Sequence, residues 1–186
     1  MRIISGTHKG RTINFIKNSK TRPLKDIVRE NIFNILEHTK LVKIKIKNSN
    51  ILDLYSGVGS FGIEAISRGA KRVMFVDQDA EATNILKKNL VKLSIEQKSA
   101  IYNSKIESVL TKDIKEKFDI FFLDPPFVSI NFFQILQMIR NKKIFSKNHI
   151  VIIHREKKAK DNFEKFLKLI QIKHYGRSKI LLGVFE

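Results

Sequence analysis

The 186-residue sequence contains no cysteine and no tryptophan, and only three prolines. Without cysteine it forms no disulfide, no thiolate metal site and no cysteine nucleophile. Its five histidines do not follow the spacing of metal ligands, so we expect no metal. It also lacks a run of about 18 apolar residues and an apolar signal segment at its start, so we expect no membrane partner and a cytoplasmic location.

Acidic residues are scarce relative to basic ones. The 36 Lys and Arg residues face 18 Asp and Glu, a formal charge of +18. Half of the excess lies in residues 1–50, where twelve basic residues oppose three acidic ones, a net +9. A basic region concentrated in one part of a chain is typical of proteins that bind a phosphate backbone. Lysine outnumbers arginine 27 to 9, as a compositional bias would also produce, so part of the charge needs no functional explanation. We favour nucleic acid as the partner, with an anionic membrane surface a distant second.

Alternating strand and helix patterns indicate an α/β fold. At the N-terminus, apolar segments flank the basic stretch 5–11, which predicts a β-hairpin, and a helix is expected over 24–38. The expected strands that follow are 51–54, 72–76, 100–103, 118–123 and 149–154, separated by expected helices at 60–69, 79–92, 106–111 and 131–140. A helix at 160–168 and two strands that can pair, 169–174 and 179–185, complete the chain. This alternation predicts a mostly parallel, doubly wound sheet with helices on both faces.

A glycine-rich segment follows the strand 51–54. Gly57, Gly59 and Gly62 form a G-x-G-x-x-G pattern, and Asp77 lies at the end of the next strand. In such sites the glycines let the backbone approach an adenosine cofactor and the acid binds its ribose hydroxyls, so a nicotinamide dinucleotide is a competitor. Asp53 favours S-adenosylmethionine, because a carboxylate at the strand exit suits a cationic ammonium and sulfonium and would repel a pyrophosphate.

Individual cofactor contacts are expected from these positions. Asp53 would interact with the methionine ammonium, directly or through water, while Asp77 would accept both ribose hydroxyls. Gln78 would flank the adenine, and the turn at 103–107 would meet the adenine amino group. The expected cofactor residues are Asp53, Tyr55, Ser56, Gly57, Gly59, Asp77, Gln78, Ser104 and Lys105. Asp79 is interpreted instead as the N-cap of the helix 79–92.

Asp124-Pro-Pro-Phe127 follows the strand 118–123 and forms the second candidate site. An amino group on an aromatic base is a poor nucleophile, because its lone pair is delocalised into the ring. Asp124 and the Pro125 carbonyl can accept its two N–H groups out of the base plane, which favours attack on a methyl donor. Pro125 and Pro126 stiffen the turn, and Phe127 offers a face on which the base can stack. We assign all four residues to catalysis; a proline stop after a buried strand is the alternative.

With both motifs, the chain resembles class I S-adenosylmethionine-dependent methyltransferases. More narrowly, it resembles the bacterial 16S rRNA (guanine(966)-N(2))-methyltransferase family. The segments that carry this resemblance are Met1–Gly6 with Lys9-Gly-Arg11, Thr21-Arg-Pro with Val28–Asn34, Asp53–Ala65, Asp124–Phe127 and Tyr175-Gly176. They occur in the family's order and span nearly the whole chain.

The resemblance implies a seven-stranded Rossmann-like fold in one domain, 1–186, with an RNA-contacting extension at 1–40 and a catalytic core at 50–186. It implies N2-methylation of one guanine of 16S rRNA in the assembled or assembling small ribosomal subunit. We expect the protein to be a monomer. The expected RNA contacts are Arg2, His8, Lys9, Arg11, Arg22 and Arg29. An ion pair of Arg29 with Asp26 or Glu30 is an equal alternative. The sequence departs from the family at Lys105-Ile106, and also before His154, to which we assign no role.

Other functions stay open. A DNA adenine-N6 methyltransferase shares the Asp-Pro-Pro-Phe motif, although we expect no separate segment here to recognise a DNA sequence. A protein glutamine methyltransferase is less favoured, since that class carries Asn at the position of Asp124. Outside the enzymes, the chain could be an RNA-binding assembly factor with a vestigial methyltransferase core. The intact acids Asp53, Asp77 and Asp124 argue against that loss of activity.

Overall fold

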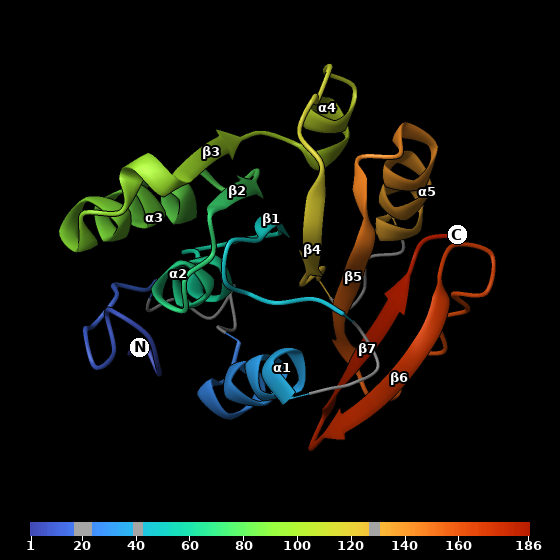
Figure 1. Ribbon diagram of the computed structural model, residues 1–186, viewed down its shortest axis with the longest axis horizontal. Coiled ribbons are helices and arrows are strands. Elements are labelled where there is room, and N and C mark those ends of the chain that lie inside the picture. Colours follow the sequence, from blue (N-terminus) through green and yellow to red (C-terminus); the bar gives the residue numbers. More distant parts are fainter. Residues whose placement is uncertain (17–23, 39–42, 127–130) are drawn as a thin grey trace.

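A single mixed sheet organises the chain in a computed structural model that describes residues 1–16, 24–38, 43–126 and 131–186. Within these ranges, seven strands follow the order β3-β2-β1-β4-β5-β7-β6 (Figure 1). The strands are β1 (Asn50–Leu54), β2 (Arg72–Asp77), β3 (Ser99–Asn103), β4 (Phe118–Leu123), β5 (Phe145–Glu156), β6 (Lys168–Tyr175) and β7 (Ser178–Val184). The helices are α1 (Asp26–His38), α2 (Ser60–Ser67), α3 (Ala80–Leu93), α4 (Ile106–Leu110) and α5 (Phe132–Lys142), with a 3-10 turn at Glu96–Lys98.

The strands β1 to β5 run parallel, and β7 is inserted antiparallel between β5 and β6. The predicted doubly wound α/β fold and the predicted C-terminal pair of strands are therefore confirmed. The chain leaves β1 toward β2 and β3 on one side and reaches β4 and β5 on the other. Ligands of such sheets bind beyond the carboxyl ends of the strands at the point where the strand order reverses, here between β1 and β4.

Both faces of the sheet are buried. Ile51 packs in a cluster with residues of α1, α2 and α3, whereas its neighbour Leu52 packs with residues of α4 and α5. Burial on both faces explains why the parallel strands are almost continuously apolar in sequence. On the first face, the ring of Phe61 in α2 stacks between Phe33 and Phe122, with centroid distances of 5.0 and 4.0 Å. This stack joins α1, α2 and β4.

The predicted helix over 160–168 is wrong. The structure has only a turn at 164–166, where the N–H groups of Phe166 and Leu167 both donate to the Phe163 carbonyl, at 2.8 and 2.9 Å. Phe163 and Phe166 contact Phe133 of α5, with ring centroids 5.4 and 5.1 Å apart. One turn is enough to present these apolar side chains to α5, so tertiary packing overrides the helical spacing of the sequence.

The N-terminal segment forms a short antiparallel hairpin, as predicted. Arg2 and Thr12 form a bridge, and the N–H groups of Ile3 and Ile13 donate to the carbonyls of Arg11 and Met1, each at 3.0 Å. Other backbone donors of this segment bind the core. The N–H groups of Ile4 and Ser5 donate to the two carboxylate oxygens of Glu64 in α2, at 2.8 and 2.9 Å. Because a side chain of the core satisfies these amides, the hairpin is docked on α2.

A second anchor fixes the same segment to α3. Asn89 is fully buried, and its side-chain oxygen accepts the Asn14 N–H at 2.8 Å while its nitrogen donates to the Asn14 carbonyl at 3.0 Å. The side-chain amide of Asn89 thus makes the same pair of hydrogen bonds to Asn14 that the backbone of a neighbouring strand would make. Its nitrogen also lies 3.4 Å from the Val58 carbonyl, in the loop between β1 and α2. One side chain therefore joins the N-terminal segment to the glycine-rich loop.

We predict that Glu64→Ala destabilises the protein by about 3–5 kcal/mol, since it leaves buried donors without their acceptor. Glu64 is 1% exposed and also accepts from Arg68 Nε at 2.8 Å. Urea unfolding followed by circular dichroism measures the loss. Glu37→Ala is the matched control, because Glu37 pairs with the same arginine at 2.8 Å but is 37% exposed, and should cost about 1 kcal/mol or less. Equal losses would contradict the role of Glu64.

Candidate active site

Three predicted acids meet at the carboxyl edge of the sheet. Asp53, near the end of β1, pairs in register with Phe75 of β2 and with Phe122 of β4. Asp77 ends β2, and Asp124 follows β4 directly, where its N–H donates to the Leu54 carbonyl at 3.3 Å. The fold therefore brings together the two motifs that lie far apart in the sequence.

Asp53 is buried beneath the glycine-rich loop, at 1% exposure. Its Oδ2 accepts the Gly62 N–H at 3.0 Å, one of the amide groups that the first turn of α2 leaves unpaired. Burial raises the pKa of Asp53 well above its ordinary value, the Gly62 bond opposes this, and the nearby Asp124 and Asp77 add to the rise. At this exposure the Asp53 carboxylate offers little surface for a direct contact with a ligand.

Asp77 holds the glycine-rich loop from the other side. Its Oδ2 accepts the Gly57 N–H at 2.7 Å, and its Oδ1 accepts the Asp79 N–H at 2.9 Å. Burial raises the pKa of Asp77, and these backbone bonds oppose the rise. Tyr55, at the start of the loop, has a φ of +59°, which is unusual for a residue with a side chain. Left-handed backbone of this kind persists where its surroundings enforce it and is frequent at ligand sites.

Gly57 and Gly62 of the glycine pattern have different structural roles. A Cβ built on Gly57 would meet nothing within 4 Å, so this part of the loop borders open space, and its φ of +53° favours glycine. A Cβ on Gly62 would lie 2.3 Å from the ring of Phe75, so Gly62 is required by the packing of α2 on β2. The space beside Gly57, whose N–H is bound by the Asp77 carboxylate, suits a cationic ligand.

The candidate adenine turn adjoins Asp77. The Ser104 N–H and the Asn103 side-chain nitrogen both donate to the Asp77 carbonyl, at 3.0 and 3.2 Å. Gln78 and Lys105 are exposed on either side of this contact. Asp79 caps α3 as predicted, because its Oδ1 accepts two N–H groups of the first helical turn at 2.9 and 3.0 Å.

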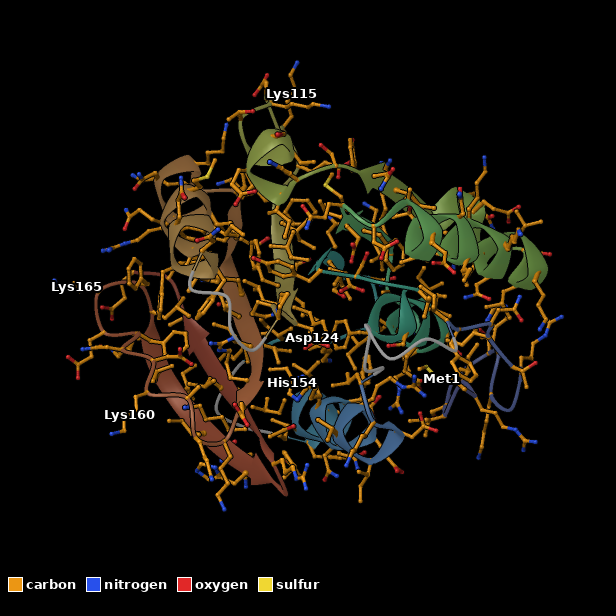
Figure 2. All side chains as sticks on the ribbon, turned by 180° about the vertical axis from the view of Figure 1, so that it is seen from behind. Met1, Lys115, Asp124, His154, Lys160 and Lys165 are labelled. Carbon is orange, nitrogen blue, oxygen red and sulfur yellow. The ribbon has the colours of Figure 1, made fainter. Side chains whose placement is uncertain are left out.

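Asp124 is 23% exposed and lies beside His154 near the centre of Figure 2, with His154 Nδ1 2.8 Å from its Oδ1. Pro125 is buried, whereas Pro126 is exposed and its carbonyl accepts from Arg155 at 3.1 Å. His154 is a contact that sequence reasoning missed. The available signal was its place at the end of the expected strand 149–154, since parallel strands bring their carboxyl ends to one edge.

The predicted RNA contacts differ in their exposure to solvent. Arg2, Lys9 and Arg11 are exposed on the N-terminal loop, and His8 is half-buried there with its ring 2.9 Å from Thr7 Oγ1. Arg22, like Phe127 of the other motif, lies outside the described residues.

The assignment of Arg29 to RNA binding is corrected. Arg29 is 1% exposed, and its Nη2 donates to the Arg2 carbonyl at 2.5 Å and to Asp26 at 3.0 Å. The alternative ion pair with Asp26 is therefore confirmed. The guanidinium fastens the N-terminal loop to α1 and is turned away from any external ligand.

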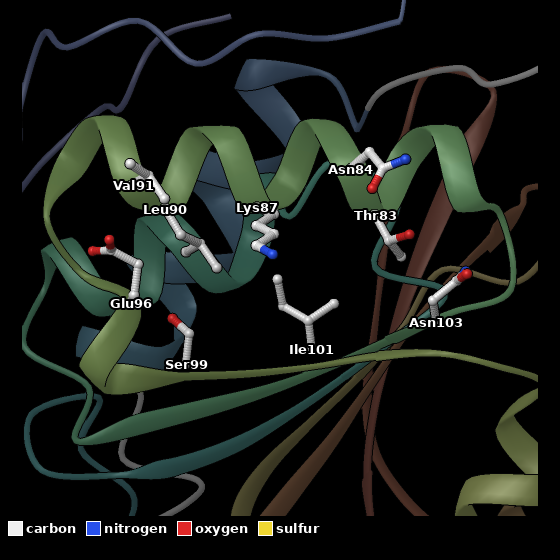
Figure 3. Close-up of a pocket in the computed structure, with 9 residues that line it drawn as sticks. All are labelled: Thr83, Asn84, Lys87, Leu90, Val91, Glu96, Ser99, Ile101 and Asn103. Atoms are coloured by element: carbon white, nitrogen blue, oxygen red, sulfur yellow. The ribbon is translucent and has the colours of Figure 1, made fainter.

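A cavity of about 430 Å³ lies between α3 and the edge strand β3 (Figure 3). It is lined by Thr83, Asn84, Lys87, Leu90, Val91, Glu96, Ser99, Ile101 and Asn103. Asn103 alone links it to the candidate adenine turn, and none of the three acids lines it. The acids of the candidate site therefore lie outside this cavity, at the carboxyl ends of β1, β2 and β4. In the described part of the chain no group of acids and histidines could hold a metal, and no helix is long and apolar enough to cross a membrane.

Comparison with known proteins gives consistent matches over most of the chain. The family model named Conserved hypothetical protein 95 matches residues 1–184. The Ribosomal RNA small subunit methyltransferase D of Haemophilus influenzae is 35% identical, over 84% of this chain and 79% of its own. The protein of that name from Buchnera aphidicola subsp. Acyrthosiphon pisum is 35% identical over 84% and 78%. The solved structure of the Escherichia coli yhhF protein has a TM-score of 0.85 at 26% identity and covers 100% of this chain and 98% of that one.

We predict that Asp53→Asn stabilises the ligand-free protein by about 0.5–2 kcal/mol near neutral pH. The folded-state pKa of Asp53 is raised above 3.8, so its favourable contribution is complete below that value and is lost as pH rises through the folded pKa. Asn cannot ionise but can still accept from Gly62. Thermal unfolding across a pH series should give a difference that is absent in acid and grows with pH. A wild-type protein that is more stable at every pH would contradict this.

Proposed function

Because the chain belongs to the ribosomal RNA small subunit methyltransferase D family, we propose that it methylates N2 of one guanine in 16S rRNA of the small ribosomal subunit, using S-adenosylmethionine. In the family convention this is guanine 966. The observation that carries the proposal is the convergence of Asp124-Pro-Pro with the loop held by Asp53 and Asp77, at one edge of the sheet.

The residues of the loop fit this cofactor. When bound, S-adenosylmethionine supplies an electrophilic methyl group on a cationic sulfonium. The charges of Asp124 and Asp77 raise the pKa of Asp53, and a nearby ammonium and sulfonium would offset this repulsion, whereas a pyrophosphate would add to it. The open space beside Gly57 would leave room for the methionine part. The backbone of Tyr55, Ser56 and Gly59 would border it. Asp77 would hold the ribose, and Gln78, Ser104 and Lys105 would border the adenine.

Asp124 and the Pro125 carbonyl would accept the two N–H groups of the guanine amine. Their placement out of the base plane directs the nitrogen lone pair toward the methyl group, so positioning lowers the barrier. Asp124 also lies where the proton released by the methylated nitrogen can be accepted. Pro126 stiffens the turn, and Phe127 would stack on the base.

The N-terminal residues 1–40 would form the RNA-contacting extension of a catalytic core at 50–186. Arg2, Lys9 and Arg11, with His8 and Arg22, would hold the phosphate backbone that flanks the target. A guanine in folded RNA must leave its stack to reach Asp124, at a cost of a few kcal/mol that is smallest in a loop. Backbone contacts on both sides of the base would offset this cost.

We predict that Asp124→Ala lowers kcat by at least about 100-fold while the dissociation constant for S-adenosylmethionine changes little. The variant loses a hydrogen-bond acceptor for the guanine amine. It keeps the bonds of Asp77 to Gly57 and of Asp53 to Gly62, which hold the glycine-rich loop. Calorimetry and transfer of a labelled methyl group measure the two quantities. Asp113→Ala, at an exposed acid outside the site, is the control. An active Asp124→Ala enzyme would remove the motif from the mechanism.

The substrate is tested by offering labelled S-adenosylmethionine with small subunits that lack the modification, with protein-free 16S rRNA and with duplex DNA. Label on the subunits as N2-methylguanine is the expected result. Label only on DNA would replace the proposal by adenine-N6 methylation. Cofactor binding without transfer to any of the three would favour a non-catalytic assembly factor.

We predict that Lys9→Ala with Arg11→Ala weakens binding to small subunits and reduces the slope of log affinity against log salt by about 2, because each cation lost removes about one phosphate contact. Filter binding at several salt concentrations measures the slope. Lys115→Ala with Lys165→Ala is the control, since Figure 2 shows both lysines away from Asp124. An unchanged slope in the first variant would exclude this loop as the RNA platform.

A further inference from the structure

His154 ends the apolar part of β5 and is nearly buried, at 10% side-chain exposure. In register it faces Ile180 of β7 on one side, and Ile153 before it pairs with Leu123 of β4. A residue held between two strands of a sheet has little freedom to move. Its ring nitrogen Nδ1 is nevertheless directed at Asp124, at a distance of 2.8 Å from Oδ1. The partly exposed carboxylate is thus attached to a rigid part of the sheet.

The next residue, Arg155, holds the following part of the turn. Its Nη1 donates to the Pro126 carbonyl at 3.1 Å. The guanidinium is itself fixed by two bonds to Asp161, at 2.9 and 3.2 Å, and lies 4.5 Å from the centroid of the Phe132 ring. Consecutive side chains of β5 therefore bind both ends of Asp124-Pro-Pro.

We propose, on the basis of the function proposed above, that His154 is a positioning residue that sets the orientation of the Asp124 carboxylate. An ionised carboxylate only accepts hydrogen bonds, so Nδ1 carries the hydrogen and donates to Oδ1. This bond restrains rotation about the Cβ–Cγ bond of Asp124, a broad torsion with no strong preference of its own. With Oδ1 occupied, Oδ2 is the oxygen presented to the guanine amine.

Orientation matters here because Asp124 must accept from an amine out of the plane of the base. A carboxylate free to rotate would spend part of its time with the wrong lone pairs toward the substrate. Small misplacements of catalytic groups can cost up to about 100-fold in rate, and such losses appear in kcat when ground-state binding is retained. His154 would contact neither substrate nor cofactor and would act through Asp124.

The test compares two substitutions of His154. In His154→Leu the donor is absent, and kcat should fall about 10- to 100-fold, while KM for small subunits and the dissociation constant for S-adenosylmethionine change less than about threefold. In His154→Asn, Nδ2 occupies a position equivalent to Nδ1, and kcat should return to within about threefold of the wild type. A structural role based on volume would instead favour Leu over Asn.

His149→Leu is the matched control. His149 is a second buried histidine of β5, and it bonds the Ser146 carbonyl at 2.8 Å and the Phe185 N–H at 2.9 Å, far from Asp124 in the strand. Its replacement should lower the melting temperature but leave kcat unchanged at temperatures where the protein is folded. If His154→Leu keeps wild-type kcat, or if His154→Asn is as slow as His154→Leu, the positioning role is overturned. An active Asp124→Ala enzyme would instead overturn the proposed function itself.

Discussion

The hydrogen bond from the Gly62 N–H to the buried Asp53 carboxylate sets the path of the chain between β1 and α2. It holds the first turn of α2 over the end of β1, and Asp77 fixes Gly57 in the intervening loop in the same way. Backbone amides thus supply the partners of both carboxylates. Burial and mutual repulsion still raise the pKa of Asp53, so this arrangement costs stability in the ligand-free protein. A cationic ligand would offset that cost, so its binding would stabilise the folded protein.

The N-terminal segment depends on the same region. Glu64 accepts its amides two residues after Gly62, and the buried Asn89 joins Asn14 to the Val58 carbonyl of the loop. The glycine-rich loop and the basic segment therefore share supports in α2 and α3. A shift of either one must strain these bonds. The exposed cations Arg2, Lys9 and Arg11 are consequently held at a fixed position relative to the candidate site.

The sequence was sufficient for the fold class, because apolar periodicity and turn residues are local properties. It also located the glycine-rich loop and Asp124-Pro-Pro, since both follow buried strands. It could not show that Arg29 turns inward, because an arginine on an amphipathic helix is exposed unless tertiary partners such as the Arg2 carbonyl exist. The helix expected over 160–168 failed for a similar reason, as the contacts of Phe163 and Phe166 with α5 are not local. His154 was missed because its place at the end of the expected strand predicts only the edge of the sheet at which it lies. Its contact with Asp124 depends on β5 lying beside β4, which the sequence of neither strand determines.

The composition of the turn explains why β5 is needed at all. Two successive prolines offer no N–H groups, so Asp124-Pro-Pro cannot be fastened through amides of its own beyond that of Asp124, which donates to the Leu54 carbonyl. Any further attachment has to come from donors on a neighbouring element that reach the carboxylate or the carbonyls. β5 is the strand next to β4 on the side away from β1, and its end supplies two such donors, His154 to the carboxylate and Arg155 to the Pro126 carbonyl. The stiffness that prolines give to the turn becomes useful for positioning an amine only when the turn as a whole is fixed to the sheet. β1 and β5 hold it from opposite sides.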